Sequence, residues 1–183
     1  MKKIFLCVIL LLLTMSEIAN GKVNKPDQTQ EPDEEEIGNF DFLYGLDGDD
    51  GFSQTERLME EAFSHMGTRY RSGAKGPTAF DCSGFTSYVY KQQANIFIGA
   101  SSRDQYARNI PISRSQLQCG DLVFFTSPNS GRNVGHVGIV VDVDPITQDF
   151  TFIHASSRNG VKLSSSNDSG YARRYIGARR IQQ

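Results

Sequence analysis

The chain has 183 residues, of which 38% are hydrophobic, so one globular domain with short extensions accounts for its length. Its formal net charge is −2 at pH 7, and apart from Lys2-Lys3 its adjacent basic residues are the pairs Arg173-Arg174 and Arg179-Arg180. This composition gives no reason to expect a nucleic acid as a partner.

The first 21 residues have the pattern of a secretory signal peptide. They open with a lysine pair, continue with an apolar run over residues 4–13 and end with the small residues of Ala19-Asn20-Gly21. The apolar run is short for a membrane span. We therefore predict export, cleavage after Gly21 and no integral membrane span in the mature chain. A retained anchor and a lipoprotein are the alternatives, although Cys7 lies too early in the apolar run for lipid modification.

Residues 22–52 are predicted to form an acidic, flexible linker. They contain two prolines and the acidic run 33–36 but no apolar periodicity, which is typical of an extended, solvated segment. Asp47-Gly48-Asp49-Asp50-Gly51 resembles the start of a calcium loop. The twelfth position of such a loop, which needs a glutamate, is Leu58, so we interpret this segment as a turn.

The folded domain is predicted to span residues 53–183 and to begin with helices. Ser53 and Glu56 fit a capping box, and apolar residues follow at helical spacing up to Gly67. A second helix is expected from Cys82, after a glycine-rich loop, and a short third helix over residues 105–108.

The second half of the domain has the periodicity of β-structure. Strands are expected over residues 122–125, 137–143, 150–155, 160–163 and 175–181. Helices followed by a meander of strands indicate an α+β fold, with N-terminal helices packed on a five- to six-stranded antiparallel sheet.

Cys82 is predicted to lie where the loop becomes the second helix. The first N–H groups of a helix lack intrahelical partners and the helix dipole is positive there, so both favour thiolate over thiol. Such positions lower a cysteine pKa from ~8.5 into the range ~3.5–7.5. The alternative is that Cys82 is a small buried apolar residue.

The three histidines are the candidates for a base that would activate this cysteine. His136 and His154 flank turn-forming residues, and a hairpin symmetric about Pro145 would place them directly opposite each other. His136 would then accept the thiol proton, and His154 would orient the His136 ring. This is the arrangement of an activated cysteine nucleophile. We assign His65, in the last turn of the first helix, a structural role.

Residues 53–183 closely resemble the NlpC/P60 family of cell-wall cysteine peptidases. The motifs that carry the resemblance are Tyr70 followed by Gly73, Phe80-Asp81-Cys82-Ser83-Gly84-Phe85, Ser101-Ser102-Arg103-Asp104-Gln105, Gly120-Asp121-Leu122-Val123-Phe124-Phe125, His136-Val137-Gly138-Ile139, Phe152-Ile153-His154-Ala155-Ser156 and Gly177-Ala178-Arg179-Arg180-Ile181. They occur in the family's order.

The resemblance implies a papain-like fold and hydrolysis of an amide bond in peptidoglycan stem peptides, typically the link from D-γ-glutamate to a diamino acid. Carried over by position, Cys82 is the nucleophile, His136 the general base and acid, and His154 the orienting residue. The implied partner is murein or its stem peptides, the implied location is the periplasm, cell envelope or exterior, and no metal or organic cofactor is implied. The oligomeric state is left open.

The resemblance also assigns substrate-binding residues. Tyr70 matches the tyrosine beside the nucleophile, where its hydroxyl or the Cys82 N–H would stabilise the oxyanion. Asp81 and Ser83 match substrate-contact positions, with Asp81 facing a free amino terminus. Alternatively, Asp81 caps the helix and Ser83 bonds within the helix's first turn.

Ser102 and Gln105 match the family's Ser-x-x-Gln motif at the rim of the site. Gly99-Ala100 stand where the family has Pro-Arg, which leaves the specificity at this rim open.

Two other classes of function remain open for this scaffold. One is an amidase or acyltransferase that uses the same cysteine, and the other is a non-catalytic wall-binding module. Cys119, where the family usually has proline, is interpreted as a thiol without a catalytic part. A disulfide between Cys82 and Cys119, which would block the nucleophile, is the alternative.

Overall fold

The computed structural model of the chain describes residues 53–182. The chain divides into two units, residues 1–51 and 52–183, and the described residues belong to the second. The predicted signal peptide, the acidic linker and the Asp47–Gly51 turn lie outside the described residues.

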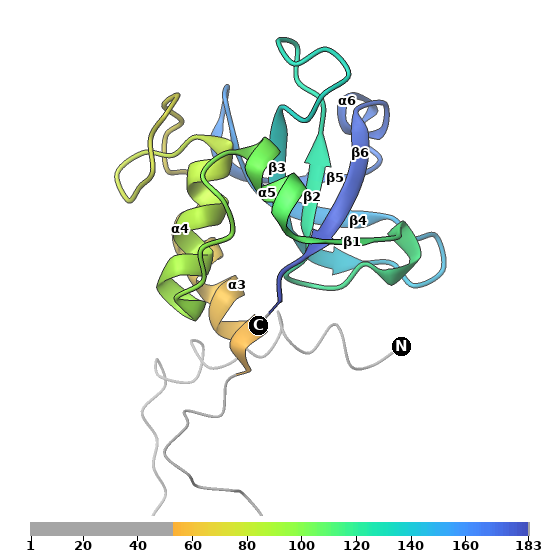
Figure 1. Ribbon diagram of the computed structural model, residues 1–183, viewed down its shortest axis with the longest axis horizontal. Helices are drawn as coiled ribbons and strands as arrows, with labels where there is room; N and C mark the ends of the chain where they lie inside the picture. Colours follow the sequence, from red (N-terminus) through yellow and green to blue (C-terminus); the bar gives the residue numbers. More distant parts are fainter. Residues whose placement is uncertain (1–52, 183) are drawn as a thin grey trace, which may run out of the picture. The chain divides into compact units, whose positions relative to one another are not determined.

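Three α-helices precede most of the sheet (Figure 1): α3 (Gln54–Ser64), α4 (Cys82–Ala94) and α5 (Ser102–Arg108). The capping box predicted at the start of α3 is confirmed, because the Ser53 side chain accepts from the Glu56 N–H and Glu56 accepts from the Ser53 N–H. α4 lies beside α3 and contacts β3 and β4, so α4 ties the helices to the sheet.

Six strands form one antiparallel sheet in the order β1-β6-β2-β3-β4-β5. The strands are β1 (Ile110–Ile112), β2 (Leu122–Phe125), β3 (His136–Val143), β4 (Phe150–Ser156), β5 (Gly160–Ser165) and β6 (Tyr175–Arg180). A 3₁₀ turn (Arg114–Gln116) precedes β2, and the short helix α6 (Ser169–Ala172) precedes β6. The α+β fold and the five predicted strands are confirmed, whereas the sequence pattern missed β1.

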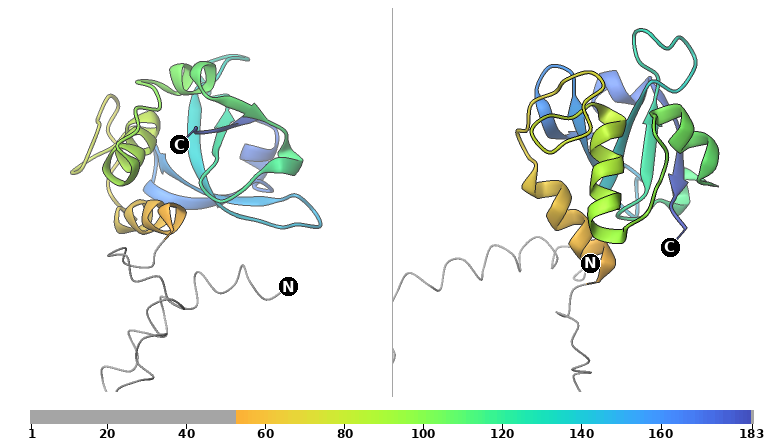
Figure 2. Two further views of the ribbon diagram at one scale, coloured as in Figure 1. Left: turned by 60° about the horizontal axis from the view of Figure 1, so that its bottom comes forward. Right: turned by 60° about the vertical axis from the view of Figure 1, so that its left-hand side comes forward.

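The sheet is strongly curved, with α3 and α4 on one side (Figure 2). Side chains alternate along β3, so Val137 and Ile139 join the core beneath the helices while Val140 joins a second cluster on the other face. In that second cluster the rings of Phe125 and Phe152 stack with centroids 4.9 Å apart. His136 also contacts the ring of Phe125, which places it on the second face.

The β3–β4 hairpin has a register that differs from the prediction. Ile139 pairs with Ile153, and the register shifts between Val140 and Asp142. One step further along this ladder, Gly138 comes opposite His154, and a Cβ at Gly138 would lie 3.1 Å from the His154 Cβ. The prediction that the two histidines face each other directly is therefore wrong, because the hairpin is not symmetric about Pro145: Val143 pairs with Phe150, and His136 lies diagonal to His154.

Within residues 53–182, no helix combines the length and the apolarity needed to cross a membrane.

Candidate active site

Cys82 is the first residue of α4, as the sequence predicts. The helix begins here because the Asp81 carboxylate accepts a hydrogen bond of 2.6 Å from the Gly84 N–H, which satisfies one unpaired donor of the first turn. The cysteine is therefore held at the helix end by the residue immediately before it.

The electrostatic environment of Cys82 favours the thiol. Burial raises the pKa of Cys82, and the charge of Asp81 raises it further, whereas backbone N–H groups of Ser83, Val137 and Cys82 itself lower it. The expected lowering of this pKa by the helix start is thus outweighed. The contact with the Val137 N–H also locates the sulfur at the start of β3, next to His136.

His136 and His154 form the pair that the sequence predicts, although by a diagonal route. His136 Nε2 lies 2.9 Å from His154 Nδ1, and the two rings are nearly perpendicular at 89°. Diagonal neighbours on adjacent strands are close enough for long side chains to meet. Because Nε2 of His136 is engaged with His154, Nδ1 is the nitrogen left to serve the Cys82 thiol.

Both imidazoles are neutral at pH 7. Burial, with a smaller contribution from the charge of Arg174, lowers the pKa of His136 to about 4. Burial also lowers the pKa of His154, and the neighbouring His136, Lys162 and Arg174 add to this effect. A neutral imidazole is the form that accepts a proton, so His136 has the protonation state of a general base.

Two hydroxyl groups extend this hydrogen-bonded chain beyond His154. His154 Nε2 lies 3.0 Å from Ser164 Oγ in β5 and 3.3 Å from Tyr171 Oη in α6. If His136 is to accept a proton on Nδ1, its Nε2–H must donate to His154 Nδ1. His154 Nε2–H then donates to Ser164 or Tyr171.

Sequence reasoning missed both hydroxyl groups. Ser164 pairs with Phe152 on the β4–β5 ladder and so lies diagonal to His154. Because side chains alternate along a strand, the position of His154 could have been used to predict Ser164 as its diagonal neighbour. Tyr171 comes from a short helix that the strand pattern does not predict.

Asp81 and Ser83 make the structural contacts that were the alternative to substrate binding. Ser83 Oγ donates to Asp81 Oδ1 at 3.1 Å, and Lys75 Nζ lies 3.3 Å from Ser83 Oγ and 3.5 Å from Asp81 Oδ1. Asp81 caps α4 at the same time. The capping interpretation is confirmed for Asp81, whereas substrate contact by either residue stays a prediction.

Tyr70 lies close to the nucleophile. Burial raises the pKa of its hydroxyl, and the charges of Cys82 and Asp81 raise it further. The hydroxyl therefore stays protonated at neutral pH and can donate a hydrogen bond, as an oxyanion-binding role requires.

Ser102 and Gln105 are buried in α5. The Gln105 amide Nε2 donates to the carbonyl oxygen of Ser83 at 3.1 Å and to the hydroxyl of Ser87 at 2.9 Å, while its oxygen accepts from Thr86. With no exposed surface, Gln105 joins α5 to the first turn of α4 and has no atom facing a substrate in this structure.

Cys119 is distant from the nucleophile. The Tyr90 hydroxyl donates to the carbonyl oxygen of Gly120, the residue after Cys119, and Tyr90 lies eight residues along α4 from Cys82. This separation along the helix is about 12 Å at 1.5 Å per residue, so the residue after Cys119 contacts the C-terminal half of α4 and not its first turn. Cys82 and Cys119 are not joined by a disulfide.

His65 has the structural environment that its sequence position predicts. Its Nε2 lies 3.0 Å from Glu61 Oε1, and its ring packs edge-on against Phe80 and Tyr88. It therefore belongs to the packing of α3 on α4.

A cysteine at the start of a helix and a buried histidine pair on an antiparallel sheet give the domain the papain-like fold class. The profile of the NlpC/P60 family matches residues 67–180, and the chain belongs to this family.

Curated relatives share the catalytic region. The probable endopeptidase p60 of Listeria grayi is 39% identical over 124 residues, which cover 68% of this chain and 22% of p60. Murein DD-endopeptidase MepS/murein LD-carboxypeptidase of Escherichia coli K12 is 35% identical over 125 residues, which cover 68% of this chain and 62% of MepS. The chain thus spans less than a quarter of p60 and less than two thirds of MepS.

A solved structure agrees with the fold. The crystal structure of a protein similar to lipoprotein, of the NLP/P60 family, from Staphylococcus aureus Mu50 has a TM-score of 0.62 and 33% identity. The match covers 72% of this chain and 43% of that chain.

Proposed function

We propose that the protein is an exported peptidoglycan endopeptidase that hydrolyses an amide bond of the stem peptide with Cys82 as nucleophile. The observation that carries this proposal is the neutral pair His136–His154, joined over 2.9 Å beside the cysteine. The similarity to p60, a probable endopeptidase, supports this type of reaction, and the similarity to MepS, which acts on murein, supports this class of substrate. The N-terminal signal pattern supports export.

In the first half of the reaction, His136 Nδ1 takes the proton of the Cys82 thiol while the sulfur attacks the scissile carbonyl carbon. The carbonyl π-electrons move to the oxygen, which the Cys82 N–H or the Tyr70 hydroxyl stabilises. The intermediate then collapses as His136 returns the proton to the amine, the C–N bond breaks, and Cys82 carries the acyl group as a thioester.

In the second half, His136 removes a proton from water, whose oxygen attacks the thioester carbonyl. The C–S bond breaks, the sulfur recovers its proton, and the product carboxylate leaves. His154 stabilises the transient imidazolium by accepting from its Nε2–H.

The bond that we propose is the D-γ-glutamyl link to a diamino acid such as meso-diaminopimelate. The likeness to MepS favours a second candidate, the D,D-bond of a peptide cross-link. An amidase, an acyltransferase or a wall-binding module are the other functions that this scaffold admits, and the complete set of Cys82, His136 and His154 disfavours binding alone.

Digestion of defined substrates tests this proposal. The purified protein is incubated with L-Ala-γ-D-Glu-meso-diaminopimelate and with cross-linked peptidoglycan, and products are identified by mass spectrometry beside a Cys82→Ala control. Free diaminopimelate or stems ending in γ-D-Glu establish the first bond, whereas uncrosslinked stems establish the second. Stem peptides released whole from the glycan indicate an amidase. No product from folded, reduced protein contradicts the proposal.

A further inference from the structure

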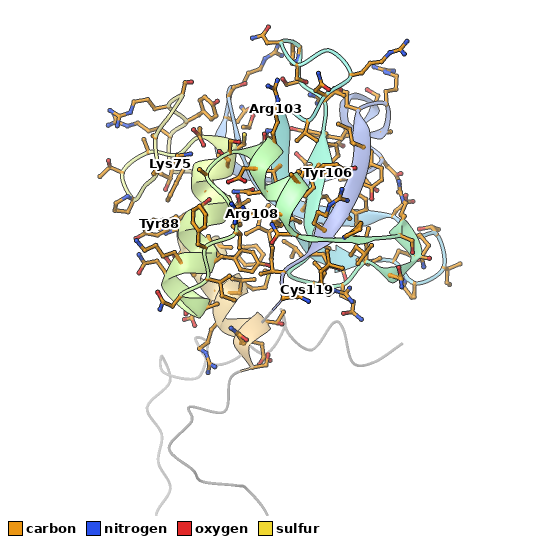
Figure 3. The ribbon with its side chains drawn as sticks, viewed as in Figure 1. Lys75, Tyr88, Arg103, Tyr106, Arg108 and Cys119 are labelled. Atoms are coloured by element: carbon orange, nitrogen blue, oxygen red, sulfur yellow. The ribbon has the colours of Figure 1, made fainter. Side chains whose placement is uncertain are left out.

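A hollow of about 440 Å³ lies between α5, the loop before β3 and β6. Its lining residues are Arg103, Tyr106, Arg132, Asn133, Val134 and Ile176. Figure 3 shows Arg103 and Tyr106 projecting from α5, with Arg103 at the end nearer the loop before β3. The lining holds two arginines and no acidic residue, so the hollow is positively charged.

The charges of these arginines have no counter-ion among residues 53–182. Arg103 uses Nε to donate to the Val134 carbonyl oxygen at 3.2 Å, which leaves both terminal nitrogens available. Arg132 is exposed, and no ion pair in the described part of the chain involves it. The nearby Asp104 is already paired with Arg108 over 3.0 Å. An arginine fork without an acidic partner is the side chain best suited to bind a carboxylate in a bidentate manner.

Two short paths connect the lining of the hollow to His136 and to Cys82. Val134, which holds Arg103, lies two residues before His136 in the chain. On the other side, Arg103 is in the same helix as Gln105, whose amide donates to the carbonyl oxygen of Ser83, the residue after Cys82. Through these contacts the hollow is connected both to the segment that leads into His136 and to the first turn of the helix that carries Cys82.

We propose that the hollow binds a free carboxylate of the stem peptide and so makes the enzyme selective for stems that are not amidated. This inference rests on the proposed function. Besides its C-terminal carboxylate, such a stem has two carboxylates that amidation would neutralise, the α-carboxylate of D-glutamate and that of the diaminopimelate side chain. Burying a charge-assisted hydrogen bond is worth about 1.5–3 kcal/mol, which corresponds to about a tenfold to hundredfold change in affinity.

Steady-state kinetics test the selectivity. The substrates are the free tripeptide, the tripeptide amidated on D-glutamate and the tripeptide amidated on the diaminopimelate side chain. Wild type is expected to show about a tenfold higher KM for one amidated tripeptide, which identifies the bound carboxylate, with kcat within about twofold. Arg103→Gln and Arg132→Gln are expected to raise KM for the free tripeptide by a similar factor and to lose the discrimination.

Lys91→Gln is the matched control, because it removes one exposed positive charge from the far end of α4. It should leave KM and the discrimination unchanged. Equal KM values for all three tripeptides in wild type, or undiminished discrimination in both arginine variants, would overturn the inference. A fall in kcat alone in Arg103→Gln, without a change in Arg132→Gln, would show that Arg103 only holds the loop before His136 and would likewise overturn it.

Binding to the Cys82→Ala protein separates this inference from the proposed function. Calorimetry with the same three peptides measures the carboxylate preference without cleavage. If wild type cleaves none of them but the preference is present, the proposed function fails and the hollow remains a carboxylate site. If wild type cleaves all of them and the Cys82→Ala protein shows no preference, the inference on the hollow fails alone.

Discussion

The buried His154 determines which nitrogen of His136 carries a proton. Its Nε2 has two hydroxyl partners, Ser164 and Tyr171, and its Nδ1 faces His136. Both hydroxyl groups can accept from His154 Nε2–H, and in that tautomer His154 Nδ1 accepts from His136 and His136 Nδ1 is free for the thiol.

Removal of the hydroxyl groups tests this arrangement. Ser164→Ala or Tyr171→Phe alone should lower kcat only a few-fold, because the other hydroxyl still accepts from His154. The double variant should lower kcat by about 10²-fold at nearly constant KM, the size expected when general-base catalysis is impaired. Tyr175→Phe is the control, since it removes a hydroxyl from the same aromatic cluster without touching His154. Equal kcat in the double variant and wild type would refute the role.

The pH dependence of kcat/KM should report the low pKa of His136. With a pKa of about 4, the imidazole remains a base well below pH 6.5 and is protonated only as the pH falls through about 4. The acid limb of the profile should therefore lie near pH 4. Arg174→Gln should move this limb upward, because it removes a positive charge that disfavours the imidazolium, but burial should keep it below 6.5. An acid limb near 6.5 in wild type would contradict the environment described for His136.

At the scale of single residues, spacing and chemistry alone predicted that Cys82 begins a helix and that His136 and His154 form a pair, and the structure shows both. The protonation state of Cys82 was not predictable, because it depends on how deeply the thiol is buried and how close Asp81 lies. The roles of Asp81 and Ser83 were equally ambiguous, since the same side chains serve a helix cap or a ligand.

Among the elements, α4 is positioned by a close approach to the loop that precedes it. A Cβ at Gly84 would lie 2.1 Å from the Ala74 carbonyl oxygen, and Ala74 O accepts from the Asp81 N–H. This contact fixes the loop against the first turn of the helix that carries Cys82.

Gly84→Ala should therefore destabilise the protein. Alanine is normally about 1 kcal/mol better than glycine inside a helix. Here the clash with a backbone atom should outweigh this gain and cost about 1–3 kcal/mol, as overpacking does. Urea unfolding measures the change, with the exposed Gln92→Ala in the same helix as control. An increase in stability would show that the loop moves away freely.

The strands show which parts of the sheet a sequence pattern can predict and which parts it cannot. The long strands were recognised because their apolar residues alternate or run continuously. β1 was not predicted, because its three residues, centred on Pro111, are too few to show a periodic pattern. The pattern did not predict the bulge between Val140 and Asp142, because a shifted pairing does not change the composition. It also did not give the register of the turn: Val143 pairs with Phe150, so the hairpin is centred beyond Pro145 and the histidines are diagonal.

For the whole molecule, two buried neutral histidines make stability depend on pH. An unfolded histidine titrates near 6.5, whereas burial lowers the pKa of His136 to about 4 and also lowers that of His154. Between these values the unfolded chain binds protons that the native protein does not. The free energy of unfolding must therefore fall as the pH falls below 6.5.

His136 alone should remove about 2 kcal/mol of stability between pH 7 and pH 5. Urea unfolding at a series of pH values measures the slope, and His154→Gln should make it shallower because that variant removes one of the two titrating groups. A free energy of unfolding that stays constant from pH 7 to pH 5 would contradict the burial of both rings.

Digestion of purified peptidoglycan by wild type, Cys82→Ala and His136→Ala, each shown to be folded and reduced, tests most directly whether this site cuts the wall peptide. Wild type should release new amino groups from stem peptides at a steady rate. Cys82→Ala should release none, and His136→Ala should be slower by about 10³-fold or more. Equal release by wild type and Cys82→Ala, or none by wild type, would contradict the assignment of Cys82 as the nucleophile of a peptidoglycan endopeptidase.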